Sequence, residues 1–205
     1  MTTTLIDLIR HGEPEGGPMF RGQTDHPLSE TGWRQMRGAL NDGEHWDAIV
    51  ASPLLRCAVF AREQAERLGV PLHTEPRLRE IGFGDWEGHT TPQVMATWGE
   101  ALQRFWDNPV DHPPPGGESL AAFRARVMEA WHHWNRQLAG KRILMVCHGG
   151  VIRMILADIL ETPLDAAFRT VAVPYASRSR IRLDESPHGR LACLLSHGSL
   201  DNPIT

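Results

Sequence analysis

Two short apolar runs, far apart in the chain, both end in a histidine followed by a glycine. Residues 4–9 lead into Arg10 and His11, and residues 142–147 lead into His148. Short apolar runs bounded by turn residues are typical of buried strands. In an open parallel α/β sheet, ligands bind outside the carboxyl ends of the strands. We therefore expect these three side chains to meet at one edge of one sheet and to form a site there.

The residue types at this predicted edge suit an anionic ligand. An arginine presents a planar fork to a phosphate or carboxylate, and a histidine is a nucleophile or proton carrier near neutral pH. The chain has 21 Lys and Arg against 25 Asp and Glu, a formal net charge of −4. No overall positive field attracts nucleic acid, and no nucleic-acid partner is expected. Local arginines must therefore hold any anionic substrate.

Arg56 is a further candidate for anion binding. Ser52 is expected to cap a helix that has Pro53 at its first position and ends at Gly69. Arg56 then lies in the first turn, where the positive end of the helix dipole disfavours a cation. A bound anion would offset that cost, which favours a phosphate-binding role over an ordinary solvated arginine.

The remaining periodicity predicts an α/β fold. Strands are expected at residues 4–9, 48–51, 70–75, 142–147, 177–184 and 190–195, and helices at residues 29–40, 53–68, 91–107, 118–138 and 151–160. Alternating strands and helices give a mainly parallel sheet with helices on both faces. The last two strands form a hairpin that adds an antiparallel edge. With 205 residues, the chain suits a single domain, residues 1–205.

Six ordered motifs resemble those of the histidine phosphatase superfamily, which has the phosphoglycerate-mutase-like fold. They are Arg10-His11-Gly12-Glu13, Asp25-His26-Pro27-Leu28-Ser29, Ser52-Pro53-Leu54-Leu55-Arg56, the stretch from Glu80 to Gly88, Gly116-Gly117-Glu118-Ser119, and His148-Gly149. The FGDWEG sequence within the fourth motif most resembles the α-ribazole phosphatase and broad-specificity phosphatase branch. The resemblance implies a three-layer α/β/α sandwich and a phosphomonoester hydrolase.

The resemblance also implies a role for each matched residue. His11 is the nucleophile that carries the phosphoryl group as phosphohistidine. Glu80 donates a proton to the leaving alcohol and then acts as the base for the attacking water. Glu87, seven residues further along, is the rival acid. The group around the phosphate consists of Arg10, Arg56, His148 and Gly149.

The sequence departs from the family pattern in the loop after the first motif. The family often has Thr or Ser where this chain has Pro14, and Asn where it has Gly17. The amide contact to phosphate is therefore not expected here. Arg21, Gly22 and Gln23 are the candidates to fill that role.

Several patterns that the sequence lacks bear on its cofactors and on its cellular compartment. The histidines show no metal-binding spacing, so no metal and no other cofactor is expected. Cys57, Cys147 and Cys193 are odd in number and widely spaced, which favours free thiols in a reducing compartment. The N-terminal apolar run contains Asp7, so no signal peptide is predicted. We expect a cytoplasmic protein that spans no membrane, and the sequence does not indicate its oligomeric state.

Three functions remain open at this stage. The first is a phosphomonoesterase, the second a 2,3-bisphosphoglycerate-dependent mutase, and the third a phospho-ligand-binding module without catalysis. Residues 88–117 are too few to build a helical pair and a lid, and residues 199–205 are too short to form a cover. Water is then expected to reach the phosphoenzyme, which favours hydrolysis over the mutase reaction.

Overall fold

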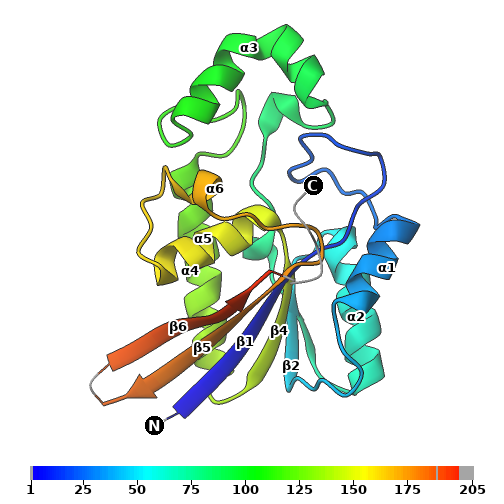
Figure 1. Ribbon diagram of the computed structural model, residues 1–205, viewed down its shortest axis with the longest axis vertical. Helices are drawn as coiled ribbons and strands as arrows, with labels where there is room; N and C mark the ends of the chain where they lie inside the picture. The colour runs from blue at the N-terminus through cyan, green and yellow to red at the C-terminus, as the bar shows by residue number, and fades with distance from the viewer. Residues whose placement is uncertain (1, 188, 199–205) are drawn as a thin grey trace.

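The computed structural model describes residues 2–187 and 189–198, and within these ranges six strands form one sheet (Figure 1). The strand order is β3-β2-β4-β1-β5-β6. The strands are β1 (Thr2–Arg10), β2 (Ala48–Ala51), β3 (Leu72–Thr74), β4 (Arg142–Cys147), β5 (Arg178–Ser186) and β6 (Gly189–His197). The first four are parallel, whereas β5 and β6 are antiparallel to their neighbours. The predicted mainly parallel sheet with an antiparallel edge is confirmed.

Helices cover both faces of this sheet, as predicted (Figure 1). The helices α1 (Glu30–Gly38) and α2 (Leu55–Leu68) pack on one face, where Ile9, Ile49 and Val146 join the core. The helices α4 (Leu120–Gln137) and α5 (Gly149–Ile159) pack on the other face, against Ile6 and Met145. Because side chains alternate along a strand, β1 and β4 supply apolar residues to both cores.

The register of the two central strands brings the predicted histidines together. Arg10 pairs with Cys147 in the parallel β1–β4 ladder. The backbone N–H of His11 continues the ladder by donating to the Cys147 carbonyl at 3.0 Å. His11 and His148 therefore follow adjacent strands at the same carboxyl edge, as the sequence predicted.

One predicted helix cap is wrong. Helix α2 begins at Leu55 and its N-cap is Leu54, which makes no side-chain cap. The Ser52 hydroxyl instead lies 2.7 Å from Nε2 of His148, and it receives only a long 3.4 Å contact from the Leu54 N–H. A buried hydroxyl takes the stronger partner, and here that partner is the imidazole. The predicted end of the helix at Gly69 is confirmed by its left-handed conformation, φ 65°.

Helix α3 (Thr91–Asp107) lies apart from the three layers, beyond the carboxyl edge of the sheet at the top of Figure 1. It starts with a capping box between Thr90 and Gln93. Its buried side chains Val94, Leu102 and Phe105 form a small third core with Trp86. Residues 88–117 thus build two helical segments, joined by a kink at Trp98 (φ −129°, ψ 34°), beyond the edge where the site was predicted.

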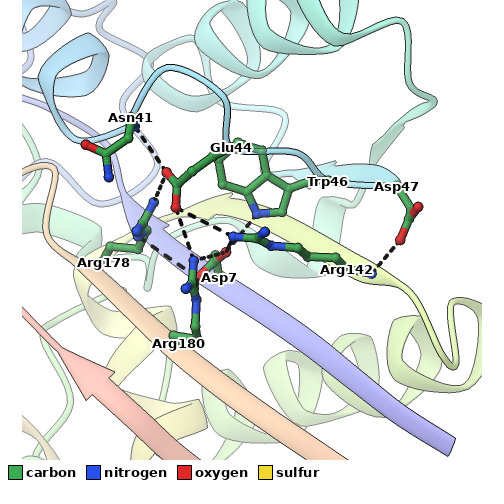
Figure 2. A network of polar contacts seen from close by, with 8 residues as sticks. All are labelled: Asp7, Asn41, Glu44, Trp46, Asp47, Arg142, Arg178 and Arg180. Carbon is green, nitrogen blue, oxygen red and sulfur yellow. Dashed lines mark hydrogen bonds and ion pairs between the residues drawn. The ribbon is translucent and has the colours of Figure 1, made fainter.

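A polar network fixes the loop between α1 and β2 against β1 and β5 (Figure 2). The fully buried carboxylate of Asp7 accepts hydrogen bonds from Trp46 Nε1 at 2.8 Å and from Arg180 Nε at 2.7 Å. Glu44 accepts from Arg178 at 2.6 Å and from Arg180 at 3.2 Å. These bonds compensate the cost of burying charge between the loop and the sheet.

Two earlier predictions fall partly outside the described residues. The single domain was predicted over residues 1–205, and the short tail over residues 199–205. Residues 1, 188 and 199–205 are not among those described. Of the helices in the described ranges, none is long and apolar enough to cross a bilayer.

Candidate active site

A cavity of about 380 Å³ opens at the carboxyl ends of β1 and β4. Several elements supply its walls: the 19–22 loop, α2, the Glu80 segment, the end of α3, the start of α5 and the segment after α6 (Ala167–Thr170). The predicted site residues on its wall are Arg10, His11, Arg21, Gly22, Arg56, Glu80 and Gly149. Seven residues predicted from separate motifs therefore meet at one cavity.

His11 is held in the form that a nucleophile requires. Its Nδ1 lies 2.7 Å from the Gly12 carbonyl oxygen, which can only accept, so Nδ1 carries a proton. Burial, Arg56 and Arg10 together hold the pKa of His11 well below its ordinary value of 6.5. The ring is therefore neutral at pH 7, and Nε2 keeps its lone pair.

Gly12 allows the loop that carries this carbonyl to pack closely on α1. A Cβ at Gly12 would lie 2.3 Å from the carbonyl oxygen of Gly32. No side chain fits at that distance, so the two backbones approach each other directly. This contact fixes the carbonyl that orients His11.

The two predicted phosphate-binding arginines are held rigidly by backbone carbonyls. Arg56 is 1% exposed and donates to the carbonyls of Thr24 and Gly22 at 2.9 and 2.7 Å. Arg10 donates to the carbonyl of Val173 at 2.6 Å. Among the described residues, Nε of each arginine is buried without a partner. An unsatisfied buried donor is costly, and a bound anion would supply acceptors beside both side chains.

The structure separates the two candidate acids. Glu80 lines the cavity and accepts from the backbone N–H groups of Ile81 and Gly150, each at 3.1 Å. Glu87 is not part of the cavity wall in the described chain. Its carboxylate accepts from the backbone N–H groups of Gln23, Thr24 and Phe83 at 2.9–3.0 Å. Glu87 therefore anchors a loop, and the geometry favours Glu80 as the acid.

His148 does not reach the cavity wall in the described structure. It is fully buried behind His11, with the Ser52 hydroxyl at its Nε2 and the Cys57 sulfur 3.7 Å from the same nitrogen. Burial, followed by Arg56 and His11, holds its pKa well below 6.5. Burial also raises the pKa of the Cys57 thiol to about 12, so Cys57 packs there as a neutral thiol. His148 thus supports His11 from behind.

The candidate phosphate-binding residues from the loop after the first motif differ in whether they reach the cavity. Arg21 and Gly22 line the cavity, whereas Gln23 does not. Arg21 spans the loop by donating to the carbonyls of Glu15 and Gly17, both at 2.7 Å. The position where the family often has Asn thus contributes a carbonyl that holds Arg21.

Tyr175 and Arg153 are among the cavity-wall residues that sequence reasoning missed. The Arg10 guanidinium stacks on the Tyr175 ring, 4.1 Å from its centroid, and the same ring lies 5.8 Å from that of His11. Arg153 donates from Nε to the carbonyl of Val171 at 2.9 Å. Tyr175 lies in an irregular segment without a sequence signal. Arg153 did carry one, because it follows Gly149 by four residues and therefore shares its helical face.

The described residues contain no group of three or more His, Cys, Asp or Glu side chains arranged to hold a metal ion. The cavity instead combines arginines with a neutral histidine and one carboxylate. That combination fits phosphoryl transfer to nitrogen, in which fixed cations stabilise the phosphoryl oxygens.

Comparison with known proteins agrees with this geometry. Residues 6–192 match the family described as histidine phosphatase superfamily (branch 1), and the chain belongs to that superfamily. Both the predicted superfamily and its fold are confirmed.

Individual relatives include mutases and phosphatases. A 2,3-bisphosphoglycerate-dependent phosphoglycerate mutase of Methylobacterium radiotolerans is 33% identical over 189 residues, covering 85% of this chain and 89% of the relative. The mycobacterial glucosyl-3-phosphoglycerate phosphatase superposes with a TM-score of 0.84 at 25% identity, covering 96% of this chain and 99% of that one. The α-ribazole phosphatase of Shigella flexneri superposes with a TM-score of 0.81 at 26% identity, covering 95% and 96%.

Proposed function

We propose that the chain is a phosphomonoester hydrolase that works through phosphohistidine on His11. The observation that carries this proposal is the Nδ1–H bond from His11 to the Gly12 carbonyl, which leaves Nε2 as the unprotonated nitrogen beside Arg10 and Arg56. A neutral imidazole nitrogen can attack phosphorus, and the two guanidinium groups can stabilise the charge on the phosphoryl oxygens.

The reaction runs in two displacements. In the first, Nε2 of His11 attacks phosphorus, the ester P–O bond breaks, and the carboxylic acid of Glu80 gives its proton to the departing alkoxide. In the second, the Glu80 carboxylate takes a proton from water, the water oxygen attacks phosphorus, and the P–N bond breaks. Inorganic phosphate leaves and Glu80 is again in its acid form. No metal ion takes part.

The substrate is a small phosphomonoester, and the volume of the cavity, which aromatic side chains line on one side, indicates the size of its alcohol. Phe83, Phe105 and Trp106 line one side of a cavity of about 380 Å³. A volume of this order holds a small organic molecule. The likeness to the Shigella flexneri enzyme supports an α-ribazole phosphatase-like or broad specificity.

A second function is supported by the relative from Methylobacterium radiotolerans, which is described as a phosphoglycerate mutase. A mutase must return the phosphoryl group to the substrate before water takes it. Helix α3 supplies one wall of the cavity through Phe105 and Trp106. Trp106 is 42% exposed, so this wall stays open to solvent and favours hydrolysis.

One assay decides between the two functions. Purified chain is incubated with a set of phosphomonoesters, including α-ribazole phosphate and 3-phosphoglycerate, with and without 2,3-bisphosphoglycerate and with and without EDTA. We expect phosphate release that needs no primer and survives chelation. Primer-dependent formation of 2-phosphoglycerate faster than phosphate release would establish the mutase instead. Loss of activity in EDTA, restored by a divalent ion, would reject the metal-free mechanism.

We also propose a cytoplasmic location. Cys57, Cys147 and Cys193 are all free thiols in the structure. Unpaired cysteines are typical of reducing compartments. Fractionation of the producing cells, with the chain detected by antibody, tests this assignment.

A further inference from the structure

The cavity holds more positive charge than one phosphate uses. Of the described residues on its wall, five are arginines and one, Glu80, is a carboxylate. Arg10 and Arg56 flank His11 and belong to the phosphate. Arg169 has its own carboxylate partner, Asp165, at 3.7 Å. Arg21 is tied by its loop carbonyls. Arg153 lies over the Phe168 ring, 5.6 Å from its centroid, and among the described residues it has no carboxylate partner and no role at the phosphate.

Arg153 is mostly buried, and its outer nitrogens are free. Its Nε donates to the Val171 carbonyl at 2.9 Å, which fixes the side chain. Within the described part of the chain, Nη1 and Nη2 make no hydrogen bond, and no carboxylate lies within ion-pair distance. A partly desolvated guanidinium whose Nη1 and Nη2 groups are free gains much binding free energy when it contacts an anion.

Gly149 locates these donors relative to the phosphate site. A Cβ at Gly149 would lie 3.3 Å from Nη1 of Arg153 and 3.4 Å from Nε of Arg10. Both guanidinium groups thus lie close to Gly149, and a side chain at this position would contact both of them. Arg153 therefore lies next to the phosphate site without being part of the group that holds His11.

Electrostatic coupling gives Arg153 the same position. Burial lowers the pKa of Arg153, and Glu80 opposes that effect. The charges that lower the pKa of His11 are those of Arg56, Arg10 and Arg21. The geometry agrees, because Glu80 accepts from the N–H of Gly150 while Arg153 lies beside Gly149, so both side chains border the start of α5. Glu80 protonates the leaving group, so this is the side on which the alcohol part of a substrate would lie.

We propose that Arg153 forms a second anion subsite, so that the preferred substrates are phosphomonoesters whose alcohol carries another anionic group. This inference rests on the proposed hydrolase function, because that function decides which side of the cavity holds the alcohol part of the substrate. A carboxylate and a second phosphate share the chemistry that a guanidinium recognises, and a binding experiment separates them.

Phosphonates test the subsite without turnover, because their P–C bond is not hydrolysed. Propylphosphonate, 3-phosphonopropionate and ethane-1,2-diphosphonate each place two methylene groups between the phosphonate and an end group, which is a methyl, a carboxylate and a phosphonate, respectively. Their dissociation constants are measured by calorimetry with the wild-type chain, Arg153→Gln, Arg153→Lys and Arg124→Gln. Arg124 of α4 serves as the control because it pairs with Asp158 of α5, the helix that carries Arg153, and it lies outside the cavity wall.

We expect wild type to bind at least one of the doubly anionic ligands about tenfold or more tightly than propylphosphonate, the gain of one charged hydrogen-bonded contact. The ligand that binds more tightly than propylphosphonate shows which second anion is recognised. Arg153→Gln should reduce this preference to within about twofold, Arg153→Lys should keep part of it, and Arg124→Gln should keep all of it. Equal binding of all three ligands by wild type, or an unchanged preference in Arg153→Gln, would overturn the subsite.

Phosphate release by the same preparations keeps the two proposals apart. If the preference is present but no monoester is hydrolysed, the subsite stands and the hydrolase function fails. If p-nitrophenyl phosphate is hydrolysed but the preference is absent, the hydrolase function stands and the subsite fails. Thermal unfolding of each variant shows whether a lost preference reflects a lost fold.

Discussion

The imidazole rings of His11 and His148 meet edge to face, with their centroids 5.1 Å apart and their planes inclined by 64°. Both rings are buried, and Arg10 and Arg56 lower the pKa of each. A proton on either ring would place a further positive charge in a space that already holds two arginines. The active-site edge is therefore built around two neutral histidines.

This arrangement predicts that stability falls in mild acid. Below pH 6.5 the unfolded chain protonates both histidines, whereas the folded chain does not until their lowered pKa values are reached. The unfolded state thus binds more protons, and each ring removes up to about 1.4 kcal/mol of unfolding free energy per pH unit. Urea denaturation between pH 7.5 and 5.5 measures the slope. His148→Asn should lower this slope of unfolding free energy against pH by about the contribution of one imidazole ring. An unchanged slope would show that the His148 ring protonates in the folded protein.

Replacing His11 by alanine should lower kcat by at least about a thousandfold, because the nucleophile is lost and no neighbour takes its place. Wild type quenched during turnover should carry phosphate that is labile in acid and stable in base, as a phosphoramidate is. Retention of more than a few per cent of the rate, or an acid-stable phosphoester, would point to a hydroxyl nucleophile such as Ser52.

Glu80→Gln should slow alkyl phosphates by about a hundredfold or more, and p-nitrophenyl phosphate far less, because nitrophenolate leaves without a proton. Glu87→Gln is the matched control. Its carboxylate binds backbone N–H groups of the 23–24 loop, so the change should lower stability and affect both substrates alike. A leaving-group effect in Glu87→Gln, absent from Glu80→Gln, would reverse the assignment.

Tyr175 should act through its ring rather than its hydroxyl. Tyr175→Phe keeps the face on which Arg10 stacks, so its vanadate affinity should stay within about threefold of wild type. Tyr175→Leu keeps an apolar side chain without an aromatic face, and it should weaken vanadate binding by about tenfold, the value of a partly buried cation–π contact. Equal affinities for the two variants would show that the stacking does not position Arg10.

Asp7→Asn should destabilise the fold by about 3 kcal/mol, because it removes the charge that compensates a partly buried arginine cluster. Glu63→Gln is a control, since its partner Arg37 is 62% exposed and the pair is solvated. Its denaturation midpoint should hardly move. Chemical denaturation at pH 7.5 measures both changes. A loss in Asp7→Asn no larger than in the control would show that the network in Figure 2 adds no stability.

The strands and most helices could be predicted because each depends on local pattern. The runs before His11 and His148 are mainly apolar, and their parallel pairing follows from the α/β alternation. The cap at Ser52 could not be predicted, because the hydroxyl chooses between a local N–H and an imidazole that is 96 residues away. Tyr175 was missed for the same reason, since its partner Arg10 comes from the opposite end of the chain.

The candidate acids show the limit of motif spacing. Glu80 and Glu87 are carboxylates of one loop, and the sequence alone favours Glu80 only through resemblance. Their environments differ because Glu87 faces the backbone of the 23–24 loop, whereas Glu80 faces the start of α5. That difference arises from how distant segments pack, which no local pattern records.

The central place of β1 bears on how the chain folds as it is synthesised. Within the described sheet this strand lies between β4 and β5, so Leu5 is in register with Arg142 and Arg182. At cellular rates of elongation, roughly 10 to 30 s pass before its first partner is made. Its apolar residues stay unpaired through that interval, and contacts of such long sequence separation make folding slow. Of the six strands of this sheet, β1, which leads into His11, is thus translated first and waits longest for a partner.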